Sequence, residues 1–236
     1  MTNDPAPYSA VIFDLDGTLL DTLADISHAA NRVLSDQGLP VHAIESYRQF
    51  VGEGVRVLFR QALPERLRSE DRVAQCAAAF QRAYAEQWHV HTRSYDGIRE
   101  LLAELVRRDV QLSVLSNKPH RFTRLCIERF LPQTPFRHIF GQREGVPRKP
   151  DPAAAIDMGR NSGVPAEQIV YVGDTAIDMQ TARAAGMYAV GVTWGFRPAA
   201  ELQATGACRL IDHPLELLEL WDEPLAARGD FQTDDH

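Results

Sequence analysis

The chain has 236 residues, of which 44% are hydrophobic and 24% charged, and its net charge at pH 7 is −7. This composition is that of an ordinary globular protein, and the length suits one large domain or a core with an inserted smaller unit. No apolar stretch approaches the roughly 18 residues that a membrane helix needs, and the acidic charge argues against non-specific binding of nucleic acid.

The three cysteines lie far apart and form no Cys-x-x-Cys pair. The sequence therefore predicts neither a disulfide framework nor a structural zinc site. The polar N-terminus carries no lysine or arginine and is unlike a secretory signal. We accordingly expect a cytoplasmic protein without membrane or nucleic-acid partners, present as a monomer or homodimer.

The first predicted element is a short buried strand, Val11–Phe13, because its residues are apolar and β-prone. Thr22 and Asp25 have the three-residue spacing of a capping box, so a helix is predicted to begin there. No convincing strand follows between residues 23 and 92. A long helix is predicted over Asp71–Trp88, where apolar side chains recur every three or four residues.

From Asp96 onward, predicted helices and strands alternate. Strands are predicted at residues 111–117, 138–141, 169–174, 188–193 and 208–211, and helices at residues 98–105, 121–130, 153–161, 176–185 and from Pro214. Such alternation is typical of crossover units that build a parallel sheet. The sequence therefore predicts an α/β fold with a Rossmann-like core, residues 1–22 and 93–222. An all-helical insertion, residues 23–92, interrupts this core, and a polar tail, residues 223–236, follows it.

Carboxylates follow two of the predicted strands. Asp14 and Asp16 come directly after the first strand, while Asp174 ends a later strand and Asp178 lies one helical turn beyond it. Because open parallel sheets bind ligands outside the carboxyl ends of their strands, we expect these acids to meet at one edge of the sheet. A few carboxylates, together with water and phosphate oxygens, usually hold Mg²⁺. The sequence therefore predicts a Mg²⁺ site.

Further polar groups at this edge suit phosphoryl transfer. Ser116 and Asn117 end the strand at 111–117, and the Ser116 hydroxyl can donate a hydrogen bond to a phosphoryl oxygen. Lys149 can supply a fixed positive charge, although on chemistry alone the neighbouring Arg148 is an equal candidate.

The paired acids Asp14 and Asp16 can divide the work of a phosphatase. A carboxylate fixed beside a metal is a candidate nucleophile toward phosphorus, so Asp14 is predicted to form an aspartyl-phosphate. Asp16 is predicted to protonate the leaving alkoxide and then to activate the water that releases phosphate.

The motifs that carry these residues resemble those of the haloacid dehalogenase superfamily. Residues 14–19, Asp-Leu-Asp-Gly-Thr-Leu, are similar to its first motif. Ser116-Asn117, Lys149 and Gly173-Asp174 with Asp178 are similar to its other three motifs, in the same order. The insertion resembles the helical C1 cap of the family, and residues 23–92 are called the cap below.

This resemblance implies a Mg²⁺-dependent phosphomonoesterase that acts on a small phosphorylated metabolite. Residues 173–187, GDTAIDMQTARAAGM, resemble the bacterial phosphoglycolate phosphatase subgroup, which makes 2-phosphoglycolate the expected substrate. The resemblance also implies that Asp14 is the nucleophile and that Asp16 gives its backbone carbonyl to the metal while its side chain does acid–base work. By the same resemblance Asp174 ligates the metal directly, and Asp178 holds it through water or orients a neighbour.

Candidate substrate-binding residues are Thr18, Gly52 and Arg56. The Gly-Glu-Gly stretch that begins at Gly52 can form a loop over the site, since glycine lets the backbone approach a ligand closely. Arg56 follows this stretch and can pair with a substrate carboxylate in bidentate fashion. The alternative interpretation of the cap arginines is a solvated surface of mixed charge.

Other functions share parts of this pattern. Within the superfamily, the alternatives are a sugar-phosphate phosphatase or phosphomutase, a pyrophosphatase and a nucleotidase. A phosphonatase needs a cap lysine, and the sequence has none before Arg93. A haloacid dehalogenase uses no metal and lacks the second acid supplied here by Asp16. From a different class, a phospho-acceptor signalling domain carries similar groups, but it is shorter and has no inserted cap.

Overall fold

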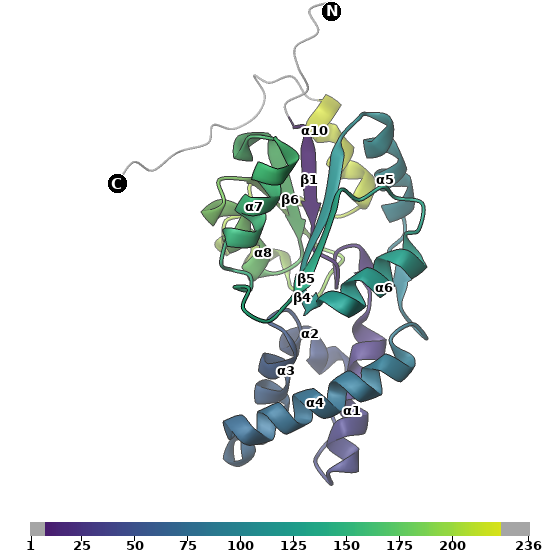
Figure 1. Cartoon of the computed structure of the whole chain (residues 1–236), viewed down its shortest axis with the longest axis vertical. Helices are drawn as coiled ribbons and strands as arrows, with labels where there is room; N and C mark the ends of the chain where they lie inside the picture. Colours follow the sequence, from purple (N-terminus) through teal and green to yellow (C-terminus); the bar gives the residue numbers. More distant parts are fainter. Residues whose placement is uncertain (1–7, 223–236) are drawn as a thin grey trace, which may run out of the picture.

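The computed structural model describes residues 8–222, and the predicted tail at 223–236 lies outside this range. Six strands form its central sheet: Ala10–Phe13 (β1), Gln111–Pro119 (β4), His138–Gln142 (β5), Ile169–Gly173 (β6), Tyr188–Val192 (β7) and Arg209–Ile211 (β8). Their order in space is β5–β4–β1–β6–β7–β8, and every neighbouring pair is parallel (Figure 1). The predicted α/β fold with a parallel sheet is confirmed.

Helices cover both faces of this sheet. On one face lie α5 (Ile98–Arg107), α6 (His120–Phe130) and α10 (Glu219–Asp222), and on the other lie α7 (Ala153–Ser162), α8 (Ala176–Ala184) and α9 (Ala199–Ala204). Side chains of β1 alternate between the two faces, as the pleat requires. Val11 and Phe13 are buried in the apolar cluster that contains α5, whereas Ala10 and Ile12 are buried in the cluster that contains α7 and α8.

The cap packs around an apolar cluster of its own. Its helices are α1 (Leu23–Asp36), α2 (Tyr47–Phe50), α3 (Val55–Ala62) and α4 (Glu70–Gln87), and they lie together beyond the end of the sheet in Figure 1. The apolar stripe of α4 faces this cluster, as its spacing predicts. Phe122 and Phe196, which come from outside the cap, are buried in the same cluster. The cap is therefore packed against the carboxyl-end edge of the core.

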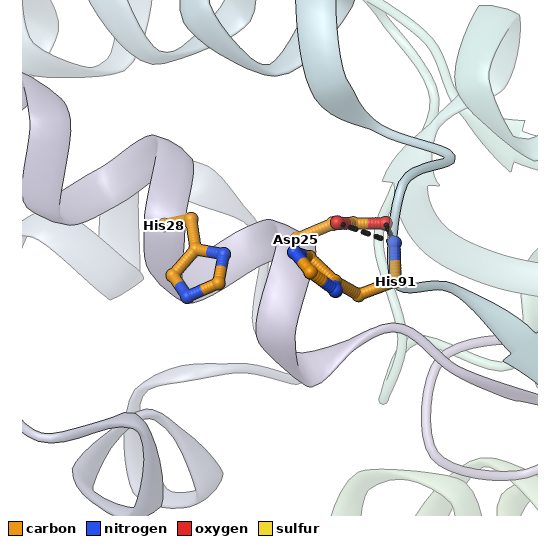
Figure 2. Close-up of side chains that lie close together, drawn as sticks. All are labelled: Asp25, His28 and His91. Atoms are coloured by element: carbon orange, nitrogen blue, oxygen red, sulfur yellow. Dashed lines mark hydrogen bonds between the residues drawn. The ribbon is translucent and has the colours of Figure 1, made fainter.

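Two chain crossings join the core to the cap. They pair as a two-stranded antiparallel sheet, β2 (Leu20–Asp21) with β3 (Arg93–Ser94). Beside it, the buried Asp25 carboxylate accepts hydrogen bonds from the amides of His91 and Thr92, at 2.9 Å each, and from the Thr92 hydroxyl at 2.7 Å. Figure 2 shows the bond from the His91 amide, with the exposed ring of His28 nearby. This carboxylate therefore ties the first turn of α1 to the returning crossing.

Some local predictions differ from the structure. The capping box at Thr22 is wrong, because the Thr22 side chain makes no capping hydrogen bond and Asp25 bonds to the returning crossing instead. The helix predicted from Pro214 is partly wrong, since Pro214–Leu218 is a 3₁₀ helix and α-helix begins only at α10. The sequence analysis missed β2, β3 and α9, because two-residue strands and a six-residue helix carry too little periodicity to detect. No helix among residues 8–222 is long and apolar enough to cross a membrane.

Candidate active site

The acids predicted from the strand ends lie together because β1 and β6 are neighbours. Phe13 pairs with Val172, and the Asp14 amide donates to the Val172 carbonyl over 2.9 Å. Asp174 directly follows β6, and Asp178 lies in the first turn of α8. Asp14, Asp174 and Asp178 are all buried, and each offers a carboxylate oxygen within 4.8 Å of those of the other two.

Glycines allow the backbone to approach Asp174 this closely. A Cβ added to Gly17 would lie 2.2 Å from Asp174 Oδ2, and Gly17 has a φ of +89°, which other residues rarely adopt. A Cβ added to Gly195 would lie 2.2 Å from the Asp174 Cβ. The Asp174 carboxylate accepts hydrogen bonds from the Thr18 hydroxyl at 3.0 Å and from the Phe196 amide at 2.8 Å. The structure thus places Thr18, predicted to contact substrate, against Asp174 and fully buried.

Lys149 supplies positive charge to this cluster. Its Nζ lies 2.9 Å from Asp14 Oδ1 and donates to Asp178 Oδ1 over 2.7 Å, and its side chain is only 3% exposed. Burial alone would lower the pKa of Lys149, but Asp14 and Asp178 hold that pKa well above its ordinary value. Arg148, the alternative on chemistry, is directed instead toward the Glu53 carbonyl of the cap, to which it donates over 3.4 Å.

Burial disfavours the ionised form of two of the acids. It raises the pKa of Asp14 to about 7, against the opposing effect of Lys149 and with added repulsion from Asp178. Burial, followed by the repulsion of Asp178 and Asp14, raises the pKa of Asp174 well above its ordinary value. A divalent cation would relieve this cost. Three hard oxygen donors suit Mg²⁺, whereas thiol or imidazole ligands suit softer metals.

Asp178 is engaged on both carboxylate oxygens. Its Oδ1 accepts from Lys149, and its Oδ2 accepts from the Thr175 amide at 3.1 Å and the Thr175 hydroxyl at 2.6 Å. The bond from the Thr175 amide belongs to a capping box at the start of α8. This arrangement suits a residue that positions Lys149 and meets a cation at its periphery.

Asp16 has a different set of partners. The Lys118 ammonium donates to Asp16 Oδ1 at 2.9 Å and Oδ2 at 3.1 Å, and to the hydroxyl of Tyr84 in α4 at 2.8 Å. Although burial would lower it, the pKa of Lys118 lies above its ordinary value because Asp16 and Tyr84 surround the ammonium. Asp16 therefore stands apart from the three clustered acids, with its side chain fixed beside the cap.

Sequence reasoning missed both Lys118 and Tyr84. A signal existed for Lys118, which directly follows the Ser116-Asn117 motif and is one of only two lysines in the sequence, the other being Lys149. Tyr84 belongs to the apolar stripe of α4, where a packing role is the ordinary interpretation. Its hydroxyl could be assigned only once the cap had been placed on the core.

Ser116 and Asn117 lie at the end of the buried part of β4. The Asn117 amide nitrogen donates to the carbonyls of Gly52 at 3.0 Å and Lys149 at 3.1 Å, and its oxygen accepts from the Lys149 amide at 3.1 Å. Asn117 therefore fixes the backbone of Lys149 and joins it to the cap loop. The Ser116 hydroxyl is buried and accepts from the Lys118 amide over 3.3 Å.

A cavity of about 60 Å³ lies between the core and the cap. Its core side is lined by Asp14, Asp16, Ser116, Asn117 and Lys118, and its cap side by Ile26, Val51, Gly52, Val55, Leu58, Phe80, Gln81 and Tyr84, among others. Most of the cap side is therefore apolar. Gly52, predicted to contact substrate, lines the cavity. Arg56 does not line it, and its guanidinium pairs with Glu70 over 2.8 Å on the surface.

Comparison with known proteins places this arrangement in a family. The sequence model of haloacid dehalogenase-like hydrolases matches residues 11–192. The chain belongs to this family. The match runs from β1 through β7 and so includes the cap and every acid of the site.

Among relatives of this hydrolase are bacterial proteins named phosphoglycolate phosphatase. One from Pseudomonas savastanoi pv. phaseolicola is 39% identical over 198 residues, 81% of this chain and 72% of the relative. Another, from Pseudomonas putida KT2440, is 37% identical over 212 residues, 88% of this chain and 78% of the relative.

Solved structures share the fold of this haloacid dehalogenase-like hydrolase. A crystal structure of a protein from Lactobacillus delbrueckii subsp. bulgaricus has a TM-score of 0.86 at 31% identity and covers 92% of this chain and 100% of that one. A crystal structure of a predicted phosphoglycolate phosphatase from Haemophilus somnus has a TM-score of 0.84 at 26% identity and covers 91% of this chain and 98% of that one. The agreement extends over nearly the whole chain, cap included.

Proposed function

We propose that this chain is a Mg²⁺-dependent phosphomonoesterase that acts through an aspartyl-phosphate on Asp14. Its substrate is a small phosphorylated metabolite, and 2-phosphoglycolate, cleaved to glycolate and phosphate, is the best candidate. The buried group of Asp14, Asp174 and Asp178, with Lys149 beside Asp14, carries this proposal. A nucleophile, a candidate cation site and a fixed positive charge meet there, and Asp14 lines the cavity between core and cap.

The residues present fit Mg²⁺. Carboxylate oxygens of Asp14 and Asp174 and the backbone carbonyl of Asp16 would hold it, with Asp178 at the periphery. The bound ion would supply charge neutralisation at the phosphoryl oxygens. The raised pKa values of Asp14 and Asp174 support this assignment, because a cation at this place favours their ionised forms.

The protein groups divide the reaction between them. An Asp14 carboxylate oxygen forms a bond to phosphorus while the bond from phosphorus to the ester oxygen breaks, and Asp16 gives its proton to that oxygen. Asp16 then takes a proton from the water that attacks phosphorus, which releases phosphate and restores Asp14. Lys149 and the Ser116 hydroxyl neutralise and orient the phosphoryl oxygens.

The cavity supports a short leaving group. Its volume of about 60 Å³ is far below the roughly 300 Å³ at which sites for drug-sized ligands begin. With the cap in this position, a two-carbon acid fits such a space better than a sugar or a nucleoside does. The relatives named phosphoglycolate phosphatase support the same choice. A sugar-phosphate phosphatase, phosphomutase, pyrophosphatase or nucleotidase therefore ranks below it.

An assay of phosphate release tests this function. Purified protein is incubated with 2-phosphoglycolate, a hexose phosphate, a nucleoside monophosphate and pyrophosphate, with Mg²⁺ or with EDTA. We expect Mg²⁺-dependent release that is fastest from 2-phosphoglycolate. A phosphomutase would instead interconvert isomers without net release, and a signalling domain would take up phosphate once without turnover.

Asp14→Asn is the decisive variant for the mechanism. It keeps the shape of the side chain but removes the nucleophilic oxygen anion, so we expect activity to fall by at least about 10³-fold. Full activity in this variant would remove the proposed mechanism. Asp16→Asn tests the acid–base role separately. The loss of activity in this variant should be greatest for esters with poor leaving groups, because these depend most on protonation of the leaving oxygen.

Two further expectations accompany this proposal. The three cysteines are free: Cys76 is buried in the cap, Cys126 is buried in the core and Cys208 is on the surface. Free cysteines agree with the predicted cytoplasmic location. Location and the choice between monomer and homodimer both stay predictions.

A further inference from the structure

We propose that Lys118 binds a carboxylate of the substrate and that Tyr84 positions its ammonium, so that docking of the cap completes a site selective for phosphate esters that carry a neighbouring acid. This inference rests on the proposed phosphomonoesterase function and names the residues that select its substrate. Lys118 would be a substrate-binding residue and Tyr84 a positioning residue.

Lys118 is the only cationic side chain among the described residues that line the cavity. Its ammonium is nearly closed off from solvent, with a side-chain exposure of 3%. An ammonium has three N–H donors. The two Asp16 oxygens, at 2.9 and 3.1 Å, can share one donor and the Tyr84 hydroxyl, at 2.8 Å, takes another. One donor then remains for an anion that enters the cavity.

The chemistry of Asp16 fixes where that anion lies. A general acid must come within hydrogen-bond distance of the leaving oxygen. In 2-phosphoglycolate the carboxylate carbon is two bonds from that oxygen. Because Lys118 Nζ lies 2.9 Å from Asp16 Oδ1, a carboxylate so close to the leaving oxygen comes within reach of the ammonium. With a substrate that lacks this carboxylate, Asp16 would be the one anionic partner of the Lys118 ammonium.

Three nearby arginine side chains interact with other groups away from the cavity. Arg56, the carboxylate partner expected from sequence, pairs with Glu70 and is 40% exposed. Arg48 donates to the Gly195 carbonyl over 2.6 Å, and Arg197 donates to the carbonyls of Gln49 and Val51. Arg48 and Arg197 thus connect the cap to the core by backbone contacts, and none of the three arginines lines the cavity.

Tyr84 links this subsite to the cap. Its ring stacks on Phe80 with centroids 5.2 Å apart and meets Phe122 edge-on at 5.0 Å. The Lys118 ammonium also lies 4.7 Å from the centroid of the Tyr84 ring. Packing therefore fixes the ring, and the hydroxyl reaches Lys118 only when α4 sits over the core. Tyr84→Phe removes the hydroxyl without opening a cavity.

The test compares two esters that differ at one group. Ethyl phosphate has the two carbons of 2-phosphoglycolate with a methyl group in place of the carboxylate. The ratio of kcat/KM for 2-phosphoglycolate to that for ethyl phosphate isolates the carboxylate contribution, since any disturbance of Asp16 affects both esters. We expect Lys118→Met to lower this ratio by about 30-fold, as loss of a hydrogen bond between charged groups predicts, and Lys118→Arg to restore part of it.

Tyr84→Phe separates positioning from packing. We expect the ratio to fall by about three- to tenfold, mainly through a higher KM for 2-phosphoglycolate, while kcat/KM for ethyl phosphate changes less. If Tyr84 had a purely structural role, its replacement would lower kcat/KM for both esters by the same factor. This variant keeps the test decisive if Lys118→Met fails to fold, which circular dichroism would reveal.

A binding measurement checks the same point without turnover. Calorimetry with 3-phosphonopropionate and propylphosphonate compares a phosphonate with and without the carboxylate, and Lys118→Met should abolish the preference of the wild type for the former. An unchanged ratio and preference in Lys118→Met overturns the proposal, and so does a collapse of the ratio in Arg56→Gln instead. A wild type that hydrolyses both esters equally also overturns it while leaving the phosphatase function intact, whereas failure to hydrolyse any monoester contradicts the proposed function itself.

Discussion

At the scale of single residues, the site is a group of charges that the fold holds together at a cost. Asp14, Asp174 and Asp178 are buried side by side, and within the described chain the Lys149 ammonium is the cation that touches two of them. Burial is the main reason why the pKa values of Asp14 and Asp174 are raised, and repulsion among the three carboxylates, which one positive charge cannot balance, adds to it. The same imbalance makes the site receptive to a divalent cation.

The raised pKa of Asp14 predicts how stability depends on pH in the metal-free protein. Unfolded Asp ionises near pH 3.8, whereas folded Asp14 keeps its proton until about pH 7. Between these values the folded state binds more protons than the unfolded state, so the free energy of unfolding should fall as pH rises, by up to about 4 kcal/mol. Urea unfolding of EDTA-treated protein at several pH values between 5 and 8 measures the upper part of this loss, about 3 kcal/mol.

Asp14→Asn and added Mg²⁺ serve as the controls for this pH dependence. The variant lacks the titrating group, so its stability should fall less over the same range, and the difference between the two curves removes the contribution of histidines. Mg²⁺ should stabilise the wild type more at pH 8 than at pH 5, because it binds the ionised carboxylates. Identical pH curves for the wild type and the variant would show that Asp14 titrates normally.

At this scale the sequence motifs predicted which side chains lie together, while the roles of these side chains stay predictions. Asp14, Asp174, Asp178 and Lys149 were all expected near one another, and their strands and loops do bring them together. Lys118 was missed because its partner Tyr84 is distant in sequence and belongs to the cap. Arg56 was chosen for its charge and its place after a glycine turn, yet local sequence cannot show that Glu70 lies opposite it.

At the scale of elements, one buried carboxylate links the two segments that connect the core to the cap. Asp25 accepts hydrogen bonds from the His91 and Thr92 amides and the Thr92 hydroxyl (Figure 2). Sequence reasoning placed Asp25 in a capping box, because local spacing reveals only partners within one turn. Its actual partners are more than sixty residues away, and only the pairing of β2 with β3 brings them near.

Asp25→Ala should therefore destabilise the protein strongly. It leaves the amides of His91 and of the buried Thr92 without their acceptor, while the Thr92 hydroxyl keeps only its bond to the Trp88 carbonyl. This predicts a loss of about 2–4 kcal/mol in the free energy of unfolding. His28→Ala is the matched control, since the exposed His28 ring lies beside Asp25 on the same helix and packs edge-on against His91. Its effect should stay within about 0.5 kcal/mol. Equal losses in the two variants, measured by urea unfolding, would contradict this role of Asp25.

At the scale of the whole molecule, polar contacts to backbone carbonyls hold much of the cap on the core. Arg48 and Arg197 reach carbonyls across the boundary, as do Asn117 and Arg148. Each such bond contributes only about 1 kcal/mol. A cap held in this way can release and redock during turnover, which water entry and product release require.

The lysines give a direct measure of this motion. Both lysines of the chain are 3% exposed in their side chains, but Lys118 has a partner on the cap whereas the partners of Lys149 are Asp14 and Asp178 of the core. Opening of the cap should therefore free Lys118 first. We expect an amine-acylating reagent to modify Lys118 at least about tenfold faster than Lys149 in the native protein, with both far slower than in urea. Mass spectrometry of the two lysine-containing peptides gives the rates.

Two controls test whether the cap contact governs the modification of Lys118. Mg²⁺ with 3-phosphonopropionate should slow this modification, and Tyr84→Phe should speed it. Faster modification of Lys149 would mean that the site opens from the core side and that the cap contact of Lys118 is not the part that moves.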